Sequence, residues 1–353
     1  MAYTTIDDPS AYFQTTLYTG DGSASQAQTN TGNSDLQPDW IWVKKRNNVR
    51  NTSNTDSSRG FNKRVETQTT SAETTTTTDV ISAQSNGFTV GNNGSTGENG
   101  DTYVAWQWKA NGGTTSSNTD GSITSTVQAN TTAGFSIVTY DGTGSSGATF
   151  GHGLGTVPNF IIIKNRSEVK DWAVYHSANT SAPETDALFL NLTDATIDNT
   201  GYWNDTAPTS SIITVGDNTK VNSSGEQHIA YCFKEIQGYS KFGSYTGNGN
   251  ADGSFVYTGF KPAWIMIKKT NNTSQWVLHD TTRQEFNMQT RFLQANQTAA
   301  ESTSSAADLD ILSNGFKLRS TDDAQNGNGD TFIYMAFAEH PFVSSKGVPT
   351  TAR

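Results

Sequence analysis

The block PAWIMIK at residues 262–268 has two earlier copies in the chain, PDWIWVK at 38–44 and PNFIIIK at 158–164. Both alternating faces of each copy carry large apolar residues, which is typical of a strand in the centre of a sheet or beneath a second layer. The leading proline fits a strand entrance, where no ladder hydrogen bond has to be donated. The sequence therefore predicts the same buried β-strand at three places.

Two further features repeat around this block. A Tyr-x-Gly turn precedes each copy, at Tyr18, Tyr140 and Tyr245. A second strand-like block follows each copy: GDTYVAW at 100–106, GEQHIAY at 225–231 and GDTFIYM at 329–335. One face of this closing block is large and apolar and the other is smaller and mixed, as in a strand with one side in a core. A repeat of about one hundred residues suits tandem domains rather than a solenoid.

We therefore predict an all-β fold of three tandem β-sandwich modules with a jelly-roll or concanavalin-A-like layout. The expected parts are an N-terminal arm (1–11), modules at 12–110, 122–236 and 237–345, a linker (111–121) and a C-terminal arm (346–353). The Gly, Ser, Thr and Asn content of the linker predicts flexibility. The second and third modules are joined directly, so we expect them to be rigid relative to each other. Both arms are expected to become ordered only against a partner, and at most one helical turn is expected, within 282–300.

Composition narrows the class of protein. The 353 residues carry a net charge of -10, with 33% hydrophobic and 10% aromatic residues, an aromatic content that disordered chains lack. The acidic balance argues against nucleic acid binding, which needs clustered Lys and Arg, and Lys44-Lys45-Arg46 is interpreted as a solvated strand end. Met1–Ser10 does not resemble a signal peptide, and no apolar run reaches the ~20 residues of a membrane helix. We expect synthesis in the cytoplasm and no membrane insertion.

Catalytic and metal sites are not expected. The single Cys232 excludes a disulfide framework and is interpreted as a packed thiol. His176 and His279 follow Trp172 and Trp276 at similar spacings, which predicts equivalent strand ends rather than a general base. Paired carboxylates for glycoside hydrolysis are defined by spatial separation, so a hydrolase stays open as an alternative.

Two kinds of ligand site remain as candidates. The Asx-rich loops at 92–101, 217–226 and 322–330 offer hard oxygen atoms for calcium, although Asn and Asp turns need no metal. Trp203, Trp172 and Trp276 are the candidates for stacking on a sugar ring, and Trp203 lies in the loop segment Gly201–Asn204. The alternative for Trp203 is an aromatic packed beneath a loop. No other cofactor is expected.

Together the opening MAYTTIDDPSAYF (1–13), the repeated blocks, WKANGG (108–113) and residues 122–135 resemble virion proteins of tailed bacteriophages of marine bacteria, the cyanophages and pelagiphages. This resemblance implies a structural, tail-fibre-like or decoration protein on the surface of a phage particle. We expect a non-enzymatic protein that attaches to a host glycan or receptor through module loops. The alternatives are a decoration protein that stabilises the capsid or tail, and a glycan depolymerase. Other virion proteins are expected partners, and a homotrimer is a further expectation.

Overall fold

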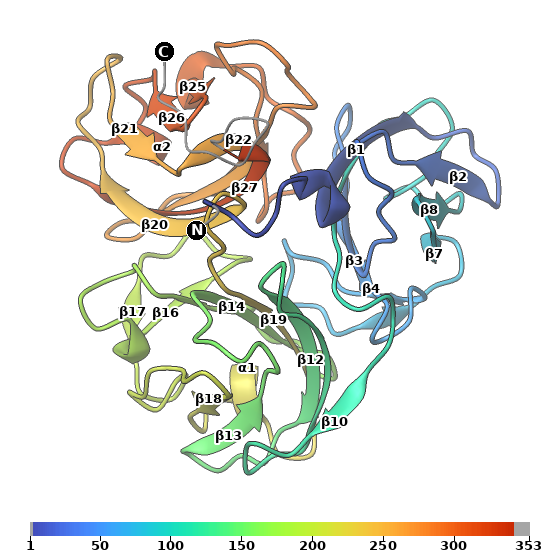
Figure 1. Cartoon of the computed structure of the whole chain (residues 1–353), viewed down its shortest axis with the longest axis vertical. Helices are drawn as coiled ribbons and strands as arrows, with labels where there is room; N and C mark the ends of the chain where they lie inside the picture. The colour runs from blue at the N-terminus through green and yellow to red at the C-terminus, as the bar shows by residue number, and fades with distance from the viewer. Residues whose placement is uncertain (1–2, 342–353) are drawn as a thin grey trace.

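The computed structural model describes residues 3–341, whose regular secondary structure is almost entirely antiparallel β-sheet (Figure 1). The prediction of an all-β fold is confirmed. The strands form three sheet groups around a common centre: the first at residues 13–108, the second at 116–233 and the third at 240–341 (Figure 1).

The first group has a four-stranded sheet of order β1-β9-β3-β4, a three-stranded sheet β2-β8-β7 and the pair β5-β6. The 3-10 helix η1 (Pro9–Ala11) precedes it. Its strands are β1 (Phe13–Thr19), β2 (Gln26–Thr29), β3 (Trp40–Lys45), β4 (Ser53–Asp56), β5 (Lys63–Arg64), β6 (Thr74–Thr75), β7 (Val80–Gln84), β8 (Gly87–Val90) and β9 (Thr102–Trp108).

The second group has an eight-stranded sheet of order β10-β11-β12-β19-β14-β15-β16-β17 and the pair β13-β18. Its elements are β10 (Ser116–Asn118), β11 (Ser125–Asn130), β12 (Phe135–Asp141), β13 (Ala148–Gly151), β14 (Phe160–Asn165), β15 (Ala173–His176), η2 (Pro183–Thr185), β16 (Asp186–Phe189), β17 (Ile197–Asp198), β18 (Ile212–Val215), α1 (Thr219–Asn222) and β19 (Gln227–Phe233).

The third group has sheets of order β20-β27-β22-β23-β24 and β21-β26-β25. Its elements are β20 (Ser240–Thr246), β21 (Phe255–Tyr257), β22 (Phe260–Lys269), β23 (Trp276–Asp280), β24 (Leu293–Gln294), η3 (Ser305–Ala307), β25 (Leu309–Leu312), β26 (Gly315–Leu318), α2 (Asp323–Asn326) and β27 (Thr331–Pro341). Residues 282–300, where one helical turn was the most that we expected, form no helix and contribute β24.

The same strand order occurs in all three groups. The order β1-β9-β3-β4 is repeated as β12-β19-β14-β15 and as β20-β27-β22-β23. The registers also correspond, because the closing strands β9, β19 and β27 place Trp106, Tyr231 and Met335 opposite Thr15, Ile137 and Phe242, respectively. Residues in the three groups can therefore be compared position by position.

The closing strands are buried on both faces, which corrects the expectation of one core-facing side. Their smaller face lies in the core of their own group, as Tyr103 and Ala105 do in the first. Their larger face points to a central core that residues of all three groups form together. In this core the ring centroids of Trp40 and Tyr231 lie 4.4 Å apart, and those of Trp108 and Trp264 lie 5.6 Å apart. The aromatic residues thus join the groups to one another as well as stabilising each.

A repeated lysine links each group to a neighbour. The Nζ atom of Lys44 donates to the carbonyl of Gln297 at 2.5 Å. In the same way Lys164 donates to Thr70 at 3.2 Å and Lys268 donates to Thr193 at 2.9 Å. The first group therefore contacts the third, the second contacts the first and the third contacts the second, which closes a ring.

These lysines are fully buried, so the interpretation of Lys44 as part of a solvated strand end is wrong. Burial lowers the pKa of Lys44 and of Lys268 to about 7 and that of Lys164 to about 8. Backbone carbonyls accept from each Nζ atom: one from Lys44, three from Lys164 and two from Lys268.

The segment predicted to be a flexible linker is structured. Its residues Ser116–Asn118 form β10, which pairs with β11. The backbone N–H groups of Gly112 and Gly113 donate to the carboxylate of Asp39 at 2.9 and 2.8 Å. Composition misled the prediction, because polar residues that form backbone hydrogen bonds to a fixed carboxylate lose the freedom that they have in a linker.

The described part of the N-terminal arm packs on its own chain. The side chain of Ile6 is buried in the central core. The Tyr3 hydroxyl donates to the carbonyl of Gly259 at 2.8 Å, and η1 lies against both β1 and β27. The expectation that this arm needs a partner to become ordered is therefore wrong for residues 3–11. The C-terminal arm predicted at 346–353 lies outside the described residues.

Candidate functional site

The three boundaries between the sheet groups are not alike. We call them seams: the first seam separates groups one and two, the second separates two and three, and the third separates three and one. The chain crosses the first and second seams directly after β9 and β19. At the third seam β27 instead continues along β22 as far as Pro341.

One repeated position shows the consequence of this difference. At the first seam Asp39 accepts N–H bonds from Ala110, Gly112 and Gly113. At the second seam Asn159 accepts the N–H of Glu235 at 2.9 Å. The third copy of the block has Ala263 there, which has no polar side-chain atom. Two copies of this position thus fasten the crossing chain and the third leaves space.

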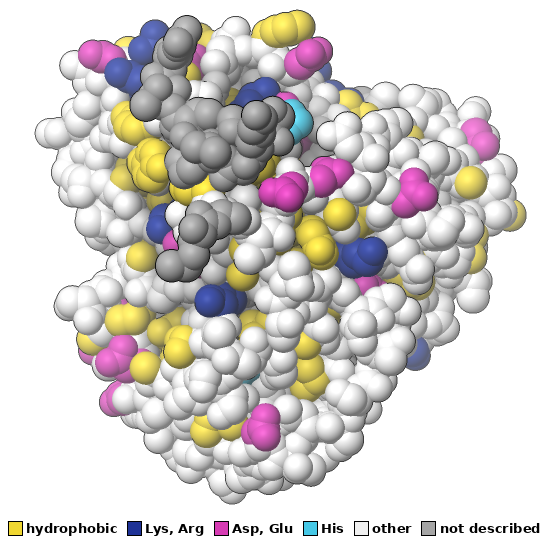
Figure 2. All heavy atoms as spheres, viewed as in Figure 1, with side chains coloured by type: hydrophobic (Ala, Val, Ile, Leu, Met, Phe, Trp, Pro, Cys, Tyr) yellow, Lys and Arg dark blue, Asp and Glu magenta, His cyan; other side chains and the backbone are white. Residues whose placement is uncertain are grey.

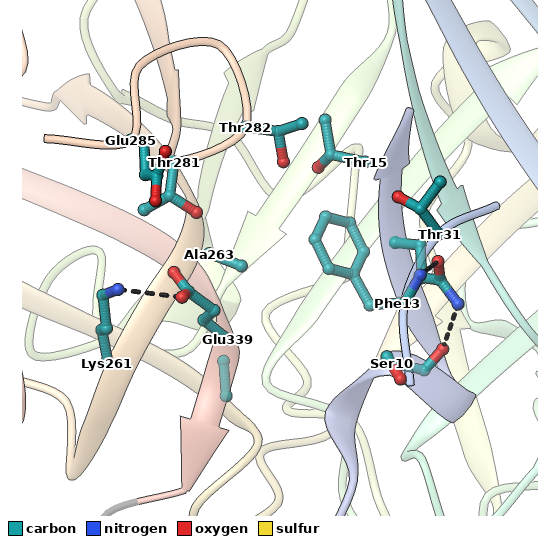
Figure 3. Close-up of a pocket in the computed structure, with 13 residues that line it drawn as sticks. Ser10, Phe13, Thr15, Thr31, Lys261, Ala263, Thr281, Thr282, Glu285 and Glu339 are labelled. Atoms are coloured by element: carbon teal, nitrogen blue, oxygen red, sulfur yellow. Dashed lines mark hydrogen bonds and ion pairs between the residues drawn. The ribbon is translucent and has the colours of Figure 1, made fainter. Parts of the chain in front are cut away.

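A cleft of about 320 Å³ occupies that space (Figure 3). One wall belongs to η1 and the first group, and it consists of Ser10, Phe13, Gln14, Thr15, Thr31 and Gly32. The opposite wall belongs to the third group and includes Lys261, Ala263, Thr281, Thr282, Glu285 and Glu339. The lining combines hydroxyl, amide and carboxylate groups with apolar surface of similar extent, and the Phe13 ring lies between the walls (Figure 3).

Gln14 forms a fixed part of the first wall. Its amide nitrogen donates to the carbonyls of Ser10 and Ser34, both at 2.8 Å, and its oxygen accepts the N–H of Gly32 at 2.9 Å. A Cβ at position 32 would lie only 2.7 Å from the Gln14 amide carbon, so the close approach depends on glycine. Gln14 is thus held in place without any ligand.

Thr15 is the unusual residue of this wall. In the repeated register it occupies the place of Ile137 and Phe242, both of which lie on the central face of their sheets. Ile137 and Phe242 belong to the central core, whereas the Thr15 Oγ1 atom is buried with no hydrogen-bond partner among residues 3–341. The first copy of this strand thus places a hydroxyl where the other two copies have an apolar side chain.

The opposite wall carries the charged groups. Lys261 Nζ and Glu339 Oε1 form an ion pair of 2.8 Å (Figure 3). The second oxygen of this carboxylate, Glu339 Oε2, is buried and has no partner in the described part of the chain. Glu285 is exposed at the rim. The cleft therefore presents two unpaired polar oxygen atoms, one on each wall.

The three tryptophans proposed from the sequence are not accessible. Each of the Trp203, Trp172 and Trp276 side chains is 1% exposed. Their indole N–H groups donate to the carbonyls of Asp186, Glu66 and Phe189, respectively. The stacking role is wrong for this structure, and the alternative for Trp203, an aromatic packed beneath a loop, is what it shows. Trp172 and Trp276 join neighbouring groups across the first and second seams.

His176 and His279 are not equivalent, contrary to the sequence alignment. His176 lies opposite Phe160, and its counterpart opposite Trp264 is Asp280. Burial lowers the pKa of His176 to about 4 and that of His279 to about 3. Both imidazoles are neutral and inaccessible at pH 7, which does not suit a general base acting on a ligand.

Lysine ammonium groups occupy two of the loops considered for calcium. Lys45 Nζ pairs with Glu98 at 2.8 Å and also with Asp101. Lys269 Nζ pairs with Asp323 and Asp330 at 2.5 and 2.7 Å. Within residues 3–341 no three His, Cys, Asp or Glu side chains gather in a way that suits a metal ion. Over the same range no helix is long and apolar enough to cross a bilayer.

The chain belongs to the family described as a domain of unknown function (DUF7483), whose model matches residues 8–341. One family model thus spans all three sheet groups. Neither the curated proteins nor the solved structures gave a match.

Sequence reasoning did not find the cleft. The sequence indicates it only through deviations from the repeat. Thr15 replaces a large apolar residue of the other two copies, and Ala263 replaces the polar residue that binds the connecting segment in them. These deviations acquire meaning only when the strand register and the packing of groups three and one are known.

Proposed function

We propose that this chain is a non-enzymatic structural protein of a bacteriophage particle that serves in tail-fibre-like attachment to a host surface. The resemblance of the repeated blocks to phage virion proteins supports the class. The arrangement of the three sheet groups supports the role, because a ring closed by Lys44, Lys164 and Lys268 makes one rigid body from three loop-bearing units.

The distribution of surface charge agrees with a protein displayed on the outside of a particle. Charged side chains are scattered over the face in Figure 2 and do not gather into a patch of one sign. An acidic, mixed surface favours solubility and disfavours non-specific adhesion to nucleic acid.

The third group offers apolar contact points for a receptor. Phe255, Tyr257 and Phe286 have exposed fractions of 47%, 54% and 75%. Exposed aromatic side chains of this kind are enriched at protein interfaces. We therefore assign recognition to the loops and edge strand of the third group.

A decoration protein that stabilises the particle is the second candidate. The observation in its favour is the approximate threefold arrangement within one chain, which matches the symmetry of threefold axes on closed shells. The arrangement also means that neither proposal requires the homotrimer expected from the sequence.

Immunogold labelling of intact particles of the phage that encodes this chain tests the proposal. Label along the tail or its fibres supports attachment, and label confined to the head shell favours decoration. Particles without label overturn both. Product analysis after incubation with host polysaccharide separates binding from depolymerisation, because only a hydrolase shortens the polymer.

A further inference from the structure

We infer that the cleft at the third seam is a binding site for a neutral saccharide, held between the Thr15 wall of the first group and the Ala263 wall of the third. This inference deepens the proposed attachment function, on which it rests, by naming a ligand class and a site. It is independent of whether the particle contact is made by the tail or the head.

The size and lining of the cleft set the ligand class. Its volume of about 320 Å³ is at the lower end of the ~300–1,000 Å³ found for small-molecule pockets. Threonine hydroxyls from both walls act as donors and acceptors at once, which matches the hydroxyl groups of a sugar. Thr15 and Thr282 come from the two facing walls (Figure 3). Ala263 adds a small apolar surface for the C–H face of a pyranose ring, whereas the Phe13 side chain beside it is 3% exposed.

The unpaired atoms point to specific hydrogen bonds. Thr15 Oγ1 and Glu339 Oε2 are buried without partners among the described residues, one on each wall. Both atoms have almost no accessible surface, so the Thr15 and Glu339 side chains must turn towards the cleft before a ligand with two hydroxyl groups bridges them, donating to the carboxylate and exchanging a hydrogen bond with the threonine. Such a bond removes the cost of an unsatisfied polar group, which is a source of binding specificity.

The charges of the lining exclude an anionic sugar. Lys261 is already paired with Glu339, and Glu285 adds a further carboxylate at the rim. A uronic acid or sialic acid would face two carboxylates and only one paired ammonium. We therefore expect binding of neutral glycosides and no binding of their anionic counterparts.

Within residues 3–341 the third seam differs from the other two at both walls of the cleft. At the first seam Asp39 binds the crossing chain, and at the second seam Asn159 does so. The replacement of this anchor by Ala263, together with Thr15 in place of Ile137 and Phe242, is confined to one seam. Two independent deviations from the repeat thus meet in one cleft.

Saturation-transfer-difference NMR on the full chain tests the inference. The probes are the methyl glycosides of glucose, galactose and mannose, with methyl glucuronide as the anionic counterpart. We expect signals from at least one neutral glycoside and none from the glucuronide. In Ala263→Trp the indole fills the cleft, so the dissociation constant should rise at least tenfold.

Two milder variants keep the test valid if the Ala263→Trp chain folds poorly. Thr15→Val keeps the shape of the side chain and removes its hydroxyl, and we expect a three- to tenfold rise of the dissociation constant. Thr19→Val makes the same change at an exposed site of the same strand and should leave binding unchanged. Circular dichroism and thermal unfolding confirm that each variant is folded.

The outcomes separate the inference from the proposed function. Absence of signal from every neutral glycoside, or equal affinity of the Thr15→Val and wild-type chains, overturns the saccharide site. Labelled phage particles together with that result leave the proposed function in place. Glycoside binding without any label on particles supports the saccharide site and overturns the proposed function.

Discussion

The first and second seams, which lie between successive sheet groups, differ from the third seam in how the two groups are held together. At the first seam the carboxylate of Asp39 fixes the connecting segment, and at the second seam Asn159 has the same role with a neutral amide. The described residues of the third seam are held by non-covalent contacts alone, among them the backbone bond from the Glu301 N–H to the Arg46 carbonyl at 2.7 Å. Among the described residues, the connecting segments fill the first and second seams, and the third seam has a cleft.

Buried ion pairs help to hold the two groups of the third seam together. Glu301 accepts bonds from Arg46 of the first group at 3.1 and 3.0 Å and from Arg283 of its own group at 3.1 Å. Burial alone would raise the pKa of Glu301, but the bonds from Arg46 and the charge of Arg283 outweigh it and hold the pKa below its usual range. At the first seam Glu73 pairs with Arg59 and Arg166 in the same manner.

Glu301→Gln should have the largest effect on stability. The change removes this carboxylate from the fully buried Arg283, which keeps its pair with Asp280. Breaking a buried pair by removing one partner costs about 3–5 kcal/mol, and we expect the low end of that range. Urea unfolding measures the loss. Glu235→Gln, which removes a partly exposed pair with Lys241, is the control and should cost at most about 1 kcal/mol.

Hydrogen exchange then compares the seams. Glu73→Gln breaks the corresponding pair at the first seam, where the connecting segment keeps the groups close. Exchange in β1 and β22 after Glu301→Gln should increase more than exchange at the first seam after Glu73→Gln. Equal increases would contradict the role that we give to the connection.

Asp39→Ala should cost more than Asn159→Ala. The Asp39 carboxylate accepts three backbone N–H bonds and the Ser57 hydroxyl, so its loss should lower the free energy of unfolding by about 2–3 kcal/mol. Asn159 accepts a single backbone N–H, and about 1 kcal/mol is expected. Chemical denaturation of both variants gives the ranking, and the reverse order would refute this account of the anchors.

Ile6→Ala tests the arm as a substitute for a connection. The Ile6 side chain is 2% exposed within the central core, and its truncation should cost about 2 kcal/mol, at the low end for buried Ile→Ala changes. Val49→Ala, at a side chain that is 65% exposed, should change stability by less than about 0.5 kcal/mol. Thermal unfolding measures both variants. A loss of stability in Ile6→Ala but not in Val49→Ala supports the role of the arm in place of a connecting segment.

The three seam lysines predict a pH dependence, a rise of stability between pH 7 and 8.5. Their folded-state pKa values of about 7, 8 and 7 for Lys44, Lys164 and Lys268 are depressed from the ordinary ~10.4. The unfolded chain therefore binds more protons in this window, so the free energy of unfolding falls as the pH is lowered towards 7. The Cys232 thiol, whose pKa burial raises to about 12, makes a smaller and opposite contribution towards pH 8.5, because the unfolded thiol begins to lose its proton there.

Lys44→Met removes one of the three groups and should reduce the slope by roughly a third. Denaturation at pH 7, 7.75 and 8.5 measures it. Lys63→Met, which changes an exposed contact with Thr75, should keep the wild-type slope. A variant slope equal to the wild-type slope would show that Lys44 is protonated at its seam throughout the window.

The sequence by itself determined the strands and their repetition. Alternating apolar residues in PAWIMIK and in the closing blocks depend on local periodicity, which one chain segment carries alone. The same periodicity predicted the two buried faces of β3, β14 and β22. It did not reveal that the large face of β9, β19 and β27 packs in a core common to the three groups. The apolar periodicity of a strand is the same whether its side chains contact their own group or a neighbouring one.

Only the tertiary structure decided how the groups are joined and where the cleft lies. The ring places Lys44 against a carbonyl more than two hundred residues away, orders the Gly112–Gly113 segment on Asp39 and buries the tryptophans that had been candidates for a ligand site. These outcomes depend on contacts between distant segments, which composition and spacing do not encode. Thr15 and Ala263 lie on opposite walls of the third seam for that reason alone.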